Sequence, residues 1–246
     1  MKQNKLIRIV FLSAMMLISS SITCREWDFE PLSKSKECKA PELQKIENQV
    51  VEYLKGSWCS QEKAELILEL VVATKPKICV EIGAFTGSSA LPMLVGLKYV
   101  KKGKAYIVEP WSNQEAIRGL PNNDPNSKWW AGLDMNAIKN QFNHTMHHWG
   151  LLPHFQLLKM TSKQAVSKIP NIDFLHLDGN FSEQGALSDT NLYLPKVVPG
   201  GYILLSNALV MVNGKAPKMK ALWPLFDQCE IIHELENGNI ILFKKN

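Results

Sequence analysis

The stretch VEIGAFTGSSALPML, residues 80–94, decides the fold. Its first residues end an apolar run, Gly83 and Gly87 bracket a turn, and the small and apolar residues that follow predict the start of a buried helix. Glycine at a strand-to-helix switch permits unusual φ angles and close approach of the backbone to a ligand. The free N–H groups at the helix start point into the same crevice. The motif is typical of a ligand-binding turn, and taken alone it also fits an ordinary α/β turn.

Short apolar runs without polar alternation recur along the chain, at 77–82, 104–110, 155–160, 172–178 and 201–206. Such runs suit strands that are buried on both faces. Segments with helical periodicity separate them and also precede them, at 41–56 and at 60–75, where Ser60 is a good N-cap. Residues 229–235 and 238–245 read as two further strands joined through ENG, a hairpin signal. We therefore expect an α/β fold, a doubly wound, mostly parallel, Rossmann-like seven-stranded sheet that ends in an antiparallel hairpin.

The N-terminus differs from the rest of the chain. MKQNKLIR is positively charged, and IVFLSAMMLISSSIT, residues 9–23, is an apolar run shorter than a membrane span needs. We expect residues 1–24 to be a signal peptide or N-terminal membrane anchor and residues 25–246 to form one domain. The protein is then exported or membrane-associated in the cell envelope, and it is cytoplasmic if the apolar run is not a signal.

Composition argues against several classes of function. The net charge of +5 comes partly from the two chain ends, and the Lys and Arg residues form no stripe interleaved with aromatic residues, so a nucleic-acid partner is not expected. The five cysteines are widely spaced and include no CxxC pair, so neither a zinc site nor a redox dithiol is indicated.

Two carboxylates lie at the predicted strand ends. Glu81 precedes the glycine turn, which suits a ligand with a cationic amine better than a pyrophosphate, because GAFTG is not the GxGxxG pattern. Glu109 ends the next strand, where doubly wound nucleotide-binding proteins place a carboxylate on the ribose hydroxyls. Their coincidence with the glycine turn favours a nucleoside ligand over solvated strand ends.

Four stretches together resemble a known family: VEIGAFTGSSA, AYIVEP, LLKMTSKQAV and IDFLHLDGNFSEQGALSDTNLYLPKVVPGGYILL. They are similar to class I S-adenosylmethionine-dependent methyltransferases, specifically the O-methyltransferase group that includes the catechol O-methyltransferase-like enzymes. The resemblance covers about residues 77–206. It implies S-adenosyl-L-methionine as the cofactor and methyl transfer to a small-molecule acceptor at oxygen.

The same resemblance assigns site residues by position. The turn and helix start would contact the methionine end of the cofactor, and this set comprises Glu81, Gly83, Ala84, Phe85, Gly87, Ser88 and Ser89. Glu109 would take the ribose hydroxyls, and Pro110 would contact the cofactor next to it. Trp111 would pack near the adenine, although it fits a core aromatic equally well. Thr161 and Ser162 match the position that meets the adenine. Asp178 would lie beside the transferred methyl group, as a catalytic residue.

The chain departs from the metal-dependent members of the group. They place an Asp-Asn pair after the fifth strand, where this sequence has Asn207 and Ala208, and a Lys or His after the LDG turn, where it has Phe181. Loss of a carboxylate should lower the affinity for Mg²⁺. We therefore expect no strict dependence on a divalent metal. If a metal site persists, its ligands are Asp178 and Asn207.

The segment between the second and third strands offers alternative bases. His147 lies three positions after His144, so both imidazoles could share one helix face and serve as catalytic bases, or both could be surface residues. Trp129 and Trp130 would line an acceptor pocket or close the core. Two functions stay open: an active methyltransferase, or a catalytically inactive methyltransferase-fold binding protein of the cell envelope. The sequence carries no signal for the oligomeric state.

Overall fold

The structure is a computed structural model that describes residues 25–212 and 214–246. The predicted signal peptide or anchor, residues 1–24, lies outside the described part. Among the described residues, no helix has both the length and the apolar character needed to cross a membrane.

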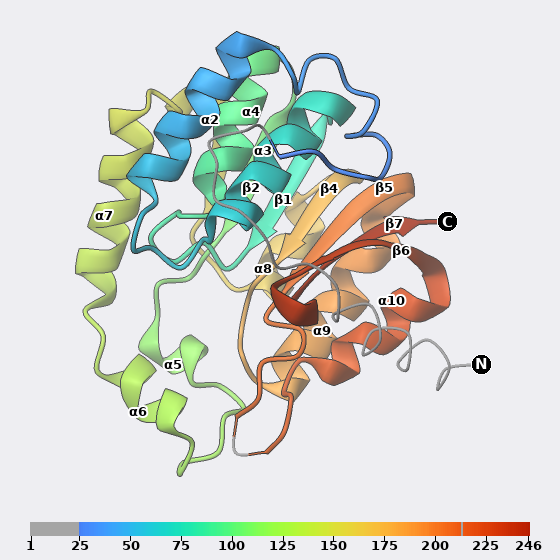
Figure 1. Cartoon of the computed structure of the whole chain (residues 1–246). Helices are drawn as coiled ribbons and strands as arrows, with labels where there is room; N and C mark the ends of the chain where they lie inside the picture. The colour runs from blue at the N-terminus through green and yellow to red at the C-terminus, as the bar shows by residue number, and fades with distance from the viewer. Residues whose placement is uncertain (1–24, 213) are drawn as a thin grey trace.

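Seven strands form one sheet in the order β3-β2-β1-β4-β5-β7-β6 (Figure 1). Strands β1 to β5 pair in parallel, whereas β7 is antiparallel to both β5 and β6. The predicted doubly wound sheet with a terminal hairpin is confirmed. The strands are β1 (Ile78–Ile82), β2 (Lys104–Val108), β3 (Phe155–Leu158), β4 (Ile172–Leu177), β5 (Val197–Ser206), β6 (Cys229–Leu235) and β7 (Ile240–Lys245).

Helices cover both faces of the sheet (Figure 1). One face carries α2 (Pro41–Tyr53), α3 (Gln61–Thr74), α4 (Ala90–Val100) and α7 (Met135–His148), and the other carries α8 (Ser162–Ala165), α9 (Glu183–Tyr193) and α10 (Leu222–Gln228). Two short helices, α5 (Asn113–Ala116) and α6 (Pro125–Ala131), lie beyond the carboxyl ends of the strands. Five 3₁₀ turns complete the described elements: Leu152–His154, Val166–Lys168, Leu194–Lys196, Met219–Ala221 and Glu236–Gly238.

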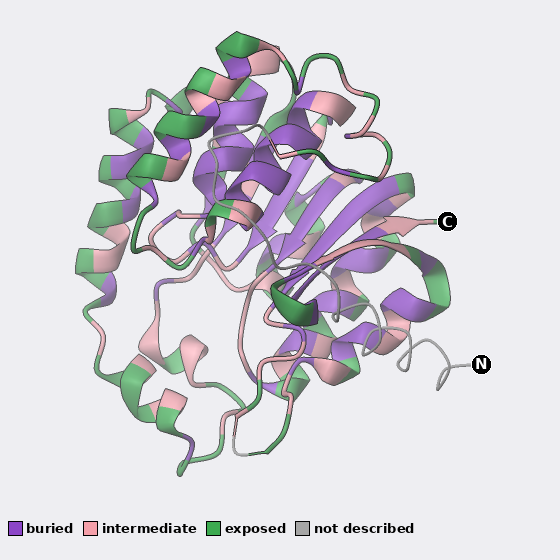
Figure 2. Ribbon diagram, in the orientation of Figure 1, coloured by how far each residue is buried: buried purple, intermediate pink, exposed green. Residues whose placement is uncertain are grey.

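The core has two layers because successive strand residues point to opposite faces. Cys79, Phe174 and Leu204 belong to the cluster under α2, α3, α4 and α7, whereas their neighbours Val80 and Leu175 belong to the cluster under α8 to α10. Figure 2 shows the central strands buried along their length. This explains why the strand runs lack polar alternation.

Two local predictions also hold. The Ser60 side chain caps α3 by accepting the Lys63 backbone N–H at 3.2 Å. In the β6–β7 hairpin, Glu236 and Asn237 adopt φ angles of 51° and 56°. Asn tolerates that left-handed region well, which accounts for the turn signal in the sequence.

Candidate functional site

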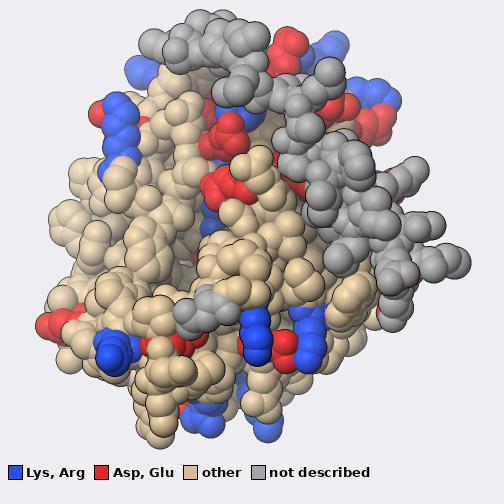
Figure 3. Space-filling view, turned by 60° about the horizontal axis from the view of Figure 1, so that its bottom comes forward, with Lys and Arg blue, Asp and Glu red and all other residues tan. Residues whose placement is uncertain are grey.

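A cavity of about 1210 Å³ opens at the carboxyl ends of the central strands. A pocket for one drug-sized ligand is about 300–1,000 Å³, so this cavity has room for a cofactor and a second small molecule. It lies where open α/β sheets place their ligands. Figure 3 looks toward this end of the molecule, where Lys, Arg, Asp and Glu side chains are scattered over a surface made mostly of other residues.

The glycine turn forms one wall of the cavity. Gly83 and Gly87 have φ angles of +88° and +86°, which L-residues rarely adopt. A Cβ added at Gly83 would collide with the backbone of Asp178. The turn therefore requires glycine both for its conformation and for its close approach to the end of β4. Ser88 and Ser89 follow it and also line the cavity.

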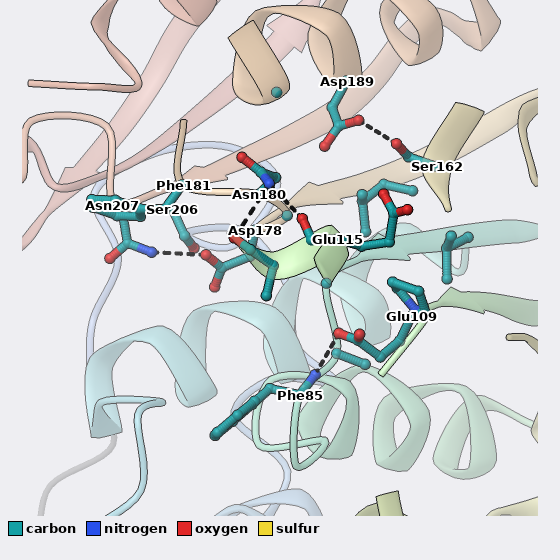
Figure 4. Close-up of a pocket in the computed structure, with 18 of the residues that line it drawn as sticks. Phe85, Glu109, Glu115, Ser162, Asp178, Asn180, Phe181, Asp189, Ser206 and Asn207 are labelled. Carbon is teal, nitrogen blue, oxygen red and sulfur yellow. Dashed lines mark hydrogen bonds between the residues drawn. The ribbon is translucent and has the colours of Figure 1, made fainter. Parts of the chain in front are cut away.

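Glu109 supports this turn from the end of β2. Its carboxylate accepts the backbone N–H of Phe85 at 3.1 Å (Figure 4) and that of Trp111 at 2.8 Å. Burial raises the Glu109 pKa, and these N–H groups partly oppose the rise. Ala84, Phe85, Glu109 and Pro110 line the cavity, as the predicted cofactor contacts require.

Trp111 lies on the other side of the same turn. Its indole Nε1–H donates to the Phe85 carbonyl oxygen at 2.9 Å, and the centroid of its ring lies 5.3 Å from that of the Phe142 ring. The side chain is buried and does not line the cavity. This position fits the alternative that Trp111 is a core aromatic residue, which supports the glycine turn on the side away from the cavity.

Glu81 is buried behind the cavity wall rather than exposed in it. Its Oε1 accepts the hydroxyl hydrogen of Ser89 and lies 3.2 Å from Nδ1 of His176. Glu81 therefore borders the cavity only through Ser89, and its contact with the methionine end of the cofactor stays a prediction.

Thr161 and Ser162 line the cavity on the far side of β2, at the start of α8. Thr161 caps this helix. The Ser162 hydroxyl donates to Asp189 at 2.5 Å, and burial raises the Asp189 pKa to about 6 (Figure 4). Thr161, Ser162 and Glu109 therefore line the same cavity.

Asp178 is surrounded by nitrogen donors. Lys63 Nζ lies 3.0 Å from Oδ2, whereas Asn207 Nδ2 at 2.8 Å and Lys218 Nζ at 3.4 Å face Oδ1. Burial opposes ionisation of Asp178, but the two ammonium groups outweigh it and hold its pKa well below the usual range. Burial also disfavours the Lys63 ammonium, yet Asp178 raises its pKa overall, whereas burial lowers the pKa of Lys218.

This arrangement does not fit a divalent cation. Asn207 turns its NH₂ group toward Asp178, so its amide offers no oxygen there, and two ammonium groups occupy the remaining space around the carboxylate. In the described ranges, no group of three His, Cys, Asp or Glu side chains could hold a metal.

The two predicted histidine bases lie away from the cavity. His144 and His147 are exposed on α7, and neither lines the cavity. The tryptophans of α6 do line it: Trp129 stacks on Trp58 with ring centroids 5.1 Å apart, and Trp58 stacks on Phe85 at the same distance. Trp58 is 64% exposed and Trp129 42%, so they form an aromatic wall at the mouth rather than part of the core.

Sequence reasoning missed Lys63, Lys218, His176 and Trp58. Lys63 left no clear signal, because it lies among the polar residues Gln61, Glu62 and Glu65 in the first turns of α3. His176 did leave a signal, because an ionisable residue that interrupts the apolar run of a buried strand is a candidate functional residue. Lys218 and Trp58 belong to loops, and nothing in their spacing indicates the cavity.

Comparisons with known proteins agree with this geometry. A sequence model described as "Methyltransferase domain" matches residues 80–208. No curated protein sequence matches the chain. Many solved structures share the fold at low identity.

Three of these structures contain the cofactor or its product. The O-methyltransferase from Bacillus cereus, in complex with S-adenosylhomocysteine, is 13% identical with a TM-score of 0.54 and coverage of 82% of this chain and 90% of its own. TomG from Streptomyces achromogenes, in complex with S-adenosylmethionine, is 13% identical with a TM-score of 0.53 and coverage of 99% and 97%. The S-adenosylhomocysteine-bound methyltransferase PaMTH1 from Podospora anserina is 12% identical, with a TM-score of 0.55 and coverage of 81% and 87%.

The matched family segment runs from the glycine turn to the end of β5 and spans more than half of the chain. The chain therefore belongs to the methyltransferase-domain family, and it is a class I S-adenosylmethionine-dependent methyltransferase.

Proposed function

We propose that this enzyme methylates a small-molecule acceptor at an oxygen atom and does so without a divalent metal. The observation that carries the proposal is the set of nitrogen donors around Asp178, Lys63 above all. Lys63 lines the cavity, and its ammonium group supplies a fixed positive charge at the place where metal-dependent relatives are expected to hold a cation.

The residues present fit the cofactor. The glycine turn leaves no room for a Cβ at Gly83, and Ser89 lies between the cavity and Glu81. The backbone of this turn would hold the methionine end, and Thr161 and Ser162 would lie beside the adenine. When bound, S-adenosylmethionine supplies a methyl group already activated on sulfur. The protein's part is then to align the acceptor oxygen and to remove its proton.

The acceptor would enter past the aromatic wall. Trp58, Phe85 and Trp129 lie on the side of the cavity that α6 borders, away from Ser162 and Asp189. Large apolar rings at a cavity mouth favour an acceptor that has an apolar face as well as a hydroxyl group.

Calorimetric titration with S-adenosylmethionine and S-adenosylhomocysteine, in EDTA and again in Mg²⁺, tests the cofactor and metal parts together. We expect micromolar binding that Mg²⁺ does not change. Transfer of a labelled methyl group to a panel of phenols, alcohols and sugars should then survive EDTA. Loss of transfer in EDTA with rescue by Mg²⁺ would overturn the metal-free proposal.

We also propose that residues 1–24 direct export or membrane association. The proposal rests on Lys2, Lys5 and Arg8 ahead of the apolar run. Cell fractionation of the full chain and of a variant with Lys2, Lys5 and Arg8 replaced by Glu tests it. Recovery of both proteins in the cytosolic fraction would contradict it.

A further inference from the structure

Three buried polar side chains form a line across the centre of the sheet. Glu81 on β1, His176 on β4 and Ser206 on β5 all point to the face under α3 and α4, and at most 1% of any of them is exposed. His176 Nδ1 lies 3.2 Å from Glu81 Oε1, and His176 Nε2 lies 2.9 Å from the Ser206 hydroxyl oxygen. A carboxylate, an imidazole and a hydroxyl in this order have the geometry by which proteins move a proton off a hydroxyl group.

Only one end of this line reaches the cavity. Ser206 lines the cavity beside Asp178 and Asn207 (Figure 4), whereas His176 and Glu81 lie behind it. A proton taken up at Ser206 would therefore pass to an imidazole that water does not reach directly. Asp178 Oδ2, at 3.8 Å from His176 Nε2, is a second carboxylate facing the ring.

Three other groups at this end of the cavity, Asp178, Lys63 and Phe181, are poor bases. Asp178 is ionised and held by Lys63, Lys218 and Asn207, so it has little tendency to take a proton. The Lys63 ammonium already carries its proton, and Phe181 has no basic atom. A hydroxyl acceptor placed beside Asp178 could reach the imidazole of His176 by way of Ser206.

We propose that Ser206, His176 and Glu81 form a proton relay for the acceptor hydroxyl. The inference rests on the proposed function, since it assigns the base that this function requires. As the methyl–sulfur bond breaks and the methyl–oxygen bond forms, the acceptor proton passes to Ser206 and the Ser206 proton passes to His176 Nε2. The resulting imidazolium lies between Glu81 and Asp178, and it later returns the proton to water in the cavity by the same route.

The relay demands one tautomer of His176. Nδ1 must carry the hydrogen and donate it to Glu81, which leaves Nε2 as the acceptor for Ser206. In the opposite tautomer Nε2–H would donate to Ser206, and the unprotonated Nδ1 would face an oxygen of Glu81 without a hydrogen bond. Glu81 already accepts the hydroxyl hydrogen of Ser89, and its Oε2 has no hydrogen-bond partner in the described part of the chain, so it is placed as an acceptor.

The tautomer can be measured without knowing the acceptor. The tautomer is read from ¹⁵N NMR of the full chain labelled with ¹⁵N-histidine and saturated with S-adenosylhomocysteine. His176 should be protonated at Nδ1 and unprotonated at Nε2. Its signals are those that disappear in His176→Gln. Ser206→Ala should shift the Nε2 resonance, and Ser188→Ala, at a serine that lines the cavity from α9, should not. Hydrogen on Nε2 would overturn the relay.

Kinetics provide the second test. With an alcohol from the acceptor panel, His176→Gln and Ser206→Ala should each lower kcat by about 100-fold or more, the range expected for loss of a general base. With an acceptor already ionised at the assay pH, such as 4-nitrophenol, the loss should be only a few-fold. An equal loss with both acceptors would contradict the relay. Absence of S-adenosylhomocysteine binding to the wild type would refute the proposed function instead. The tautomer of His176 would then still show whether Ser206, His176 and Glu81 have the hydrogen-bond arrangement that the relay requires.

Discussion

At the scale of single residues, the contact between Lys63 and Asp178 couples stability to the site. Lys63 is 4% exposed, and its ammonium group compensates a carboxylate that is itself largely enclosed. Removing one partner of a buried ion pair costs about 3–5 kcal/mol, because the other charge is left uncompensated. We expect Lys63→Met to lower the free energy of unfolding by the smaller end of this range, since Lys218 and Asn207 remain beside Asp178.

Urea unfolding of Lys63→Met, Asp178→Asn and the double variant measures this coupling. The double variant should be more stable than the sum of the single losses predicts. Additive losses would mean that the two groups do not interact.

The same contact makes stability depend on pH. The pKa of Asp178 is lower in the folded state, so its contribution to the free energy of unfolding is present at neutral pH and is lost as the pH falls below the unfolded pKa of about 3.9.

Glu109 is the residue on which the shape of the glycine turn depends. Glu109→Ala removes the acceptor for two backbone N–H groups, those of Phe85 and Trp111, as well as the carboxylate proposed for the ribose. Hydrogen bonds to a charged group contribute about 1.5–3 kcal/mol, so the affinity for S-adenosylhomocysteine should fall by about 10- to 100-fold. Calorimetry on Glu115→Ala, a carboxylate at the cavity that pairs with the exposed Arg118, is the control. Unchanged affinity in Glu109→Ala would remove the ribose assignment.

At the scale of elements, the β1–α4 turn is sensitive to a single methyl group. Gly83→Ala places a Cβ against backbone atoms of Asp178, which cannot move without shifting β4. Gly87→Ala meets the side chains of Met146 and Phe142 at 2.8 Å, and the Met146 chain can adjust. Gly56 also has a positive φ angle but has nothing within 4 Å, so Gly56→Ala isolates the conformational cost of about 1–2 kcal/mol.

The expected order of destabilisation is Gly83→Ala, then Gly87→Ala, then Gly56→Ala, measured as the free energy of unfolding in urea. Only the first two should also weaken S-adenosylhomocysteine binding, because Gly83 and Gly87 shape the turn whose residues Gly83, Ala84, Phe85 and Thr86 line the cavity, whereas Gly56 lies outside that turn. A Gly83→Ala variant as stable as Gly56→Ala would show that the end of β4 can move away from the turn.

Elements defined by local pattern were predictable from the sequence, and contacts between distant elements were not. The strands, the Ser60 cap, the glycine turn and the β6–β7 hairpin each depend on residues within one short segment. The neighbours of His176 come from β1 and β5, 95 and 30 residues away, and depend on strand order. Lys63 meets Asp178 across 115 residues, so its role follows only from how α3 packs on the sheet.

At the scale of the whole molecule, a pair of buried carboxyl groups lies outside the cavity, where the N-terminal segment packs on helices α2 and α3. Glu47 on α2 interacts with Glu69 on α3, and Glu69 also interacts with Trp27. Each of the two carboxyl groups has one oxygen without a hydrogen-bond partner among the described residues. Burial raises the pKa of Glu47 to about 9, with Glu69 and Glu65 adding to the rise, and raises that of Glu69 to about 7. Both carboxyls are therefore held in the protonated form more strongly when the chain is folded.

The pH dependence of unfolding follows from that difference. A carboxyl whose pKa is higher in the folded state contributes fully below its unfolded value of 4.5, and the contribution is lost as the pH rises through about 7 and about 9. Each unit of difference corresponds to about 1.4 kcal/mol. Between pH 4.5 and 9 the free energy of unfolding should thus fall more steeply for the wild type than for Glu47→Gln, which keeps the volume of the side chain and removes its titration.

Glu42→Gln is the matched control, since Glu42 lies on the same helix and is exposed. Its curve should run parallel to that of the wild type, whereas the Glu47→Gln curve should cross it and lie above it at pH 9. Parallel curves for all three proteins would mean that water or a rearrangement of Trp27 relieves the buried carboxyls as the pH rises. A flatter Glu47→Gln curve would place the packing of residues 25–40 on α2 and α3 among the pH-sensitive contacts of the fold, separate from the cavity on the carboxyl side of the sheet.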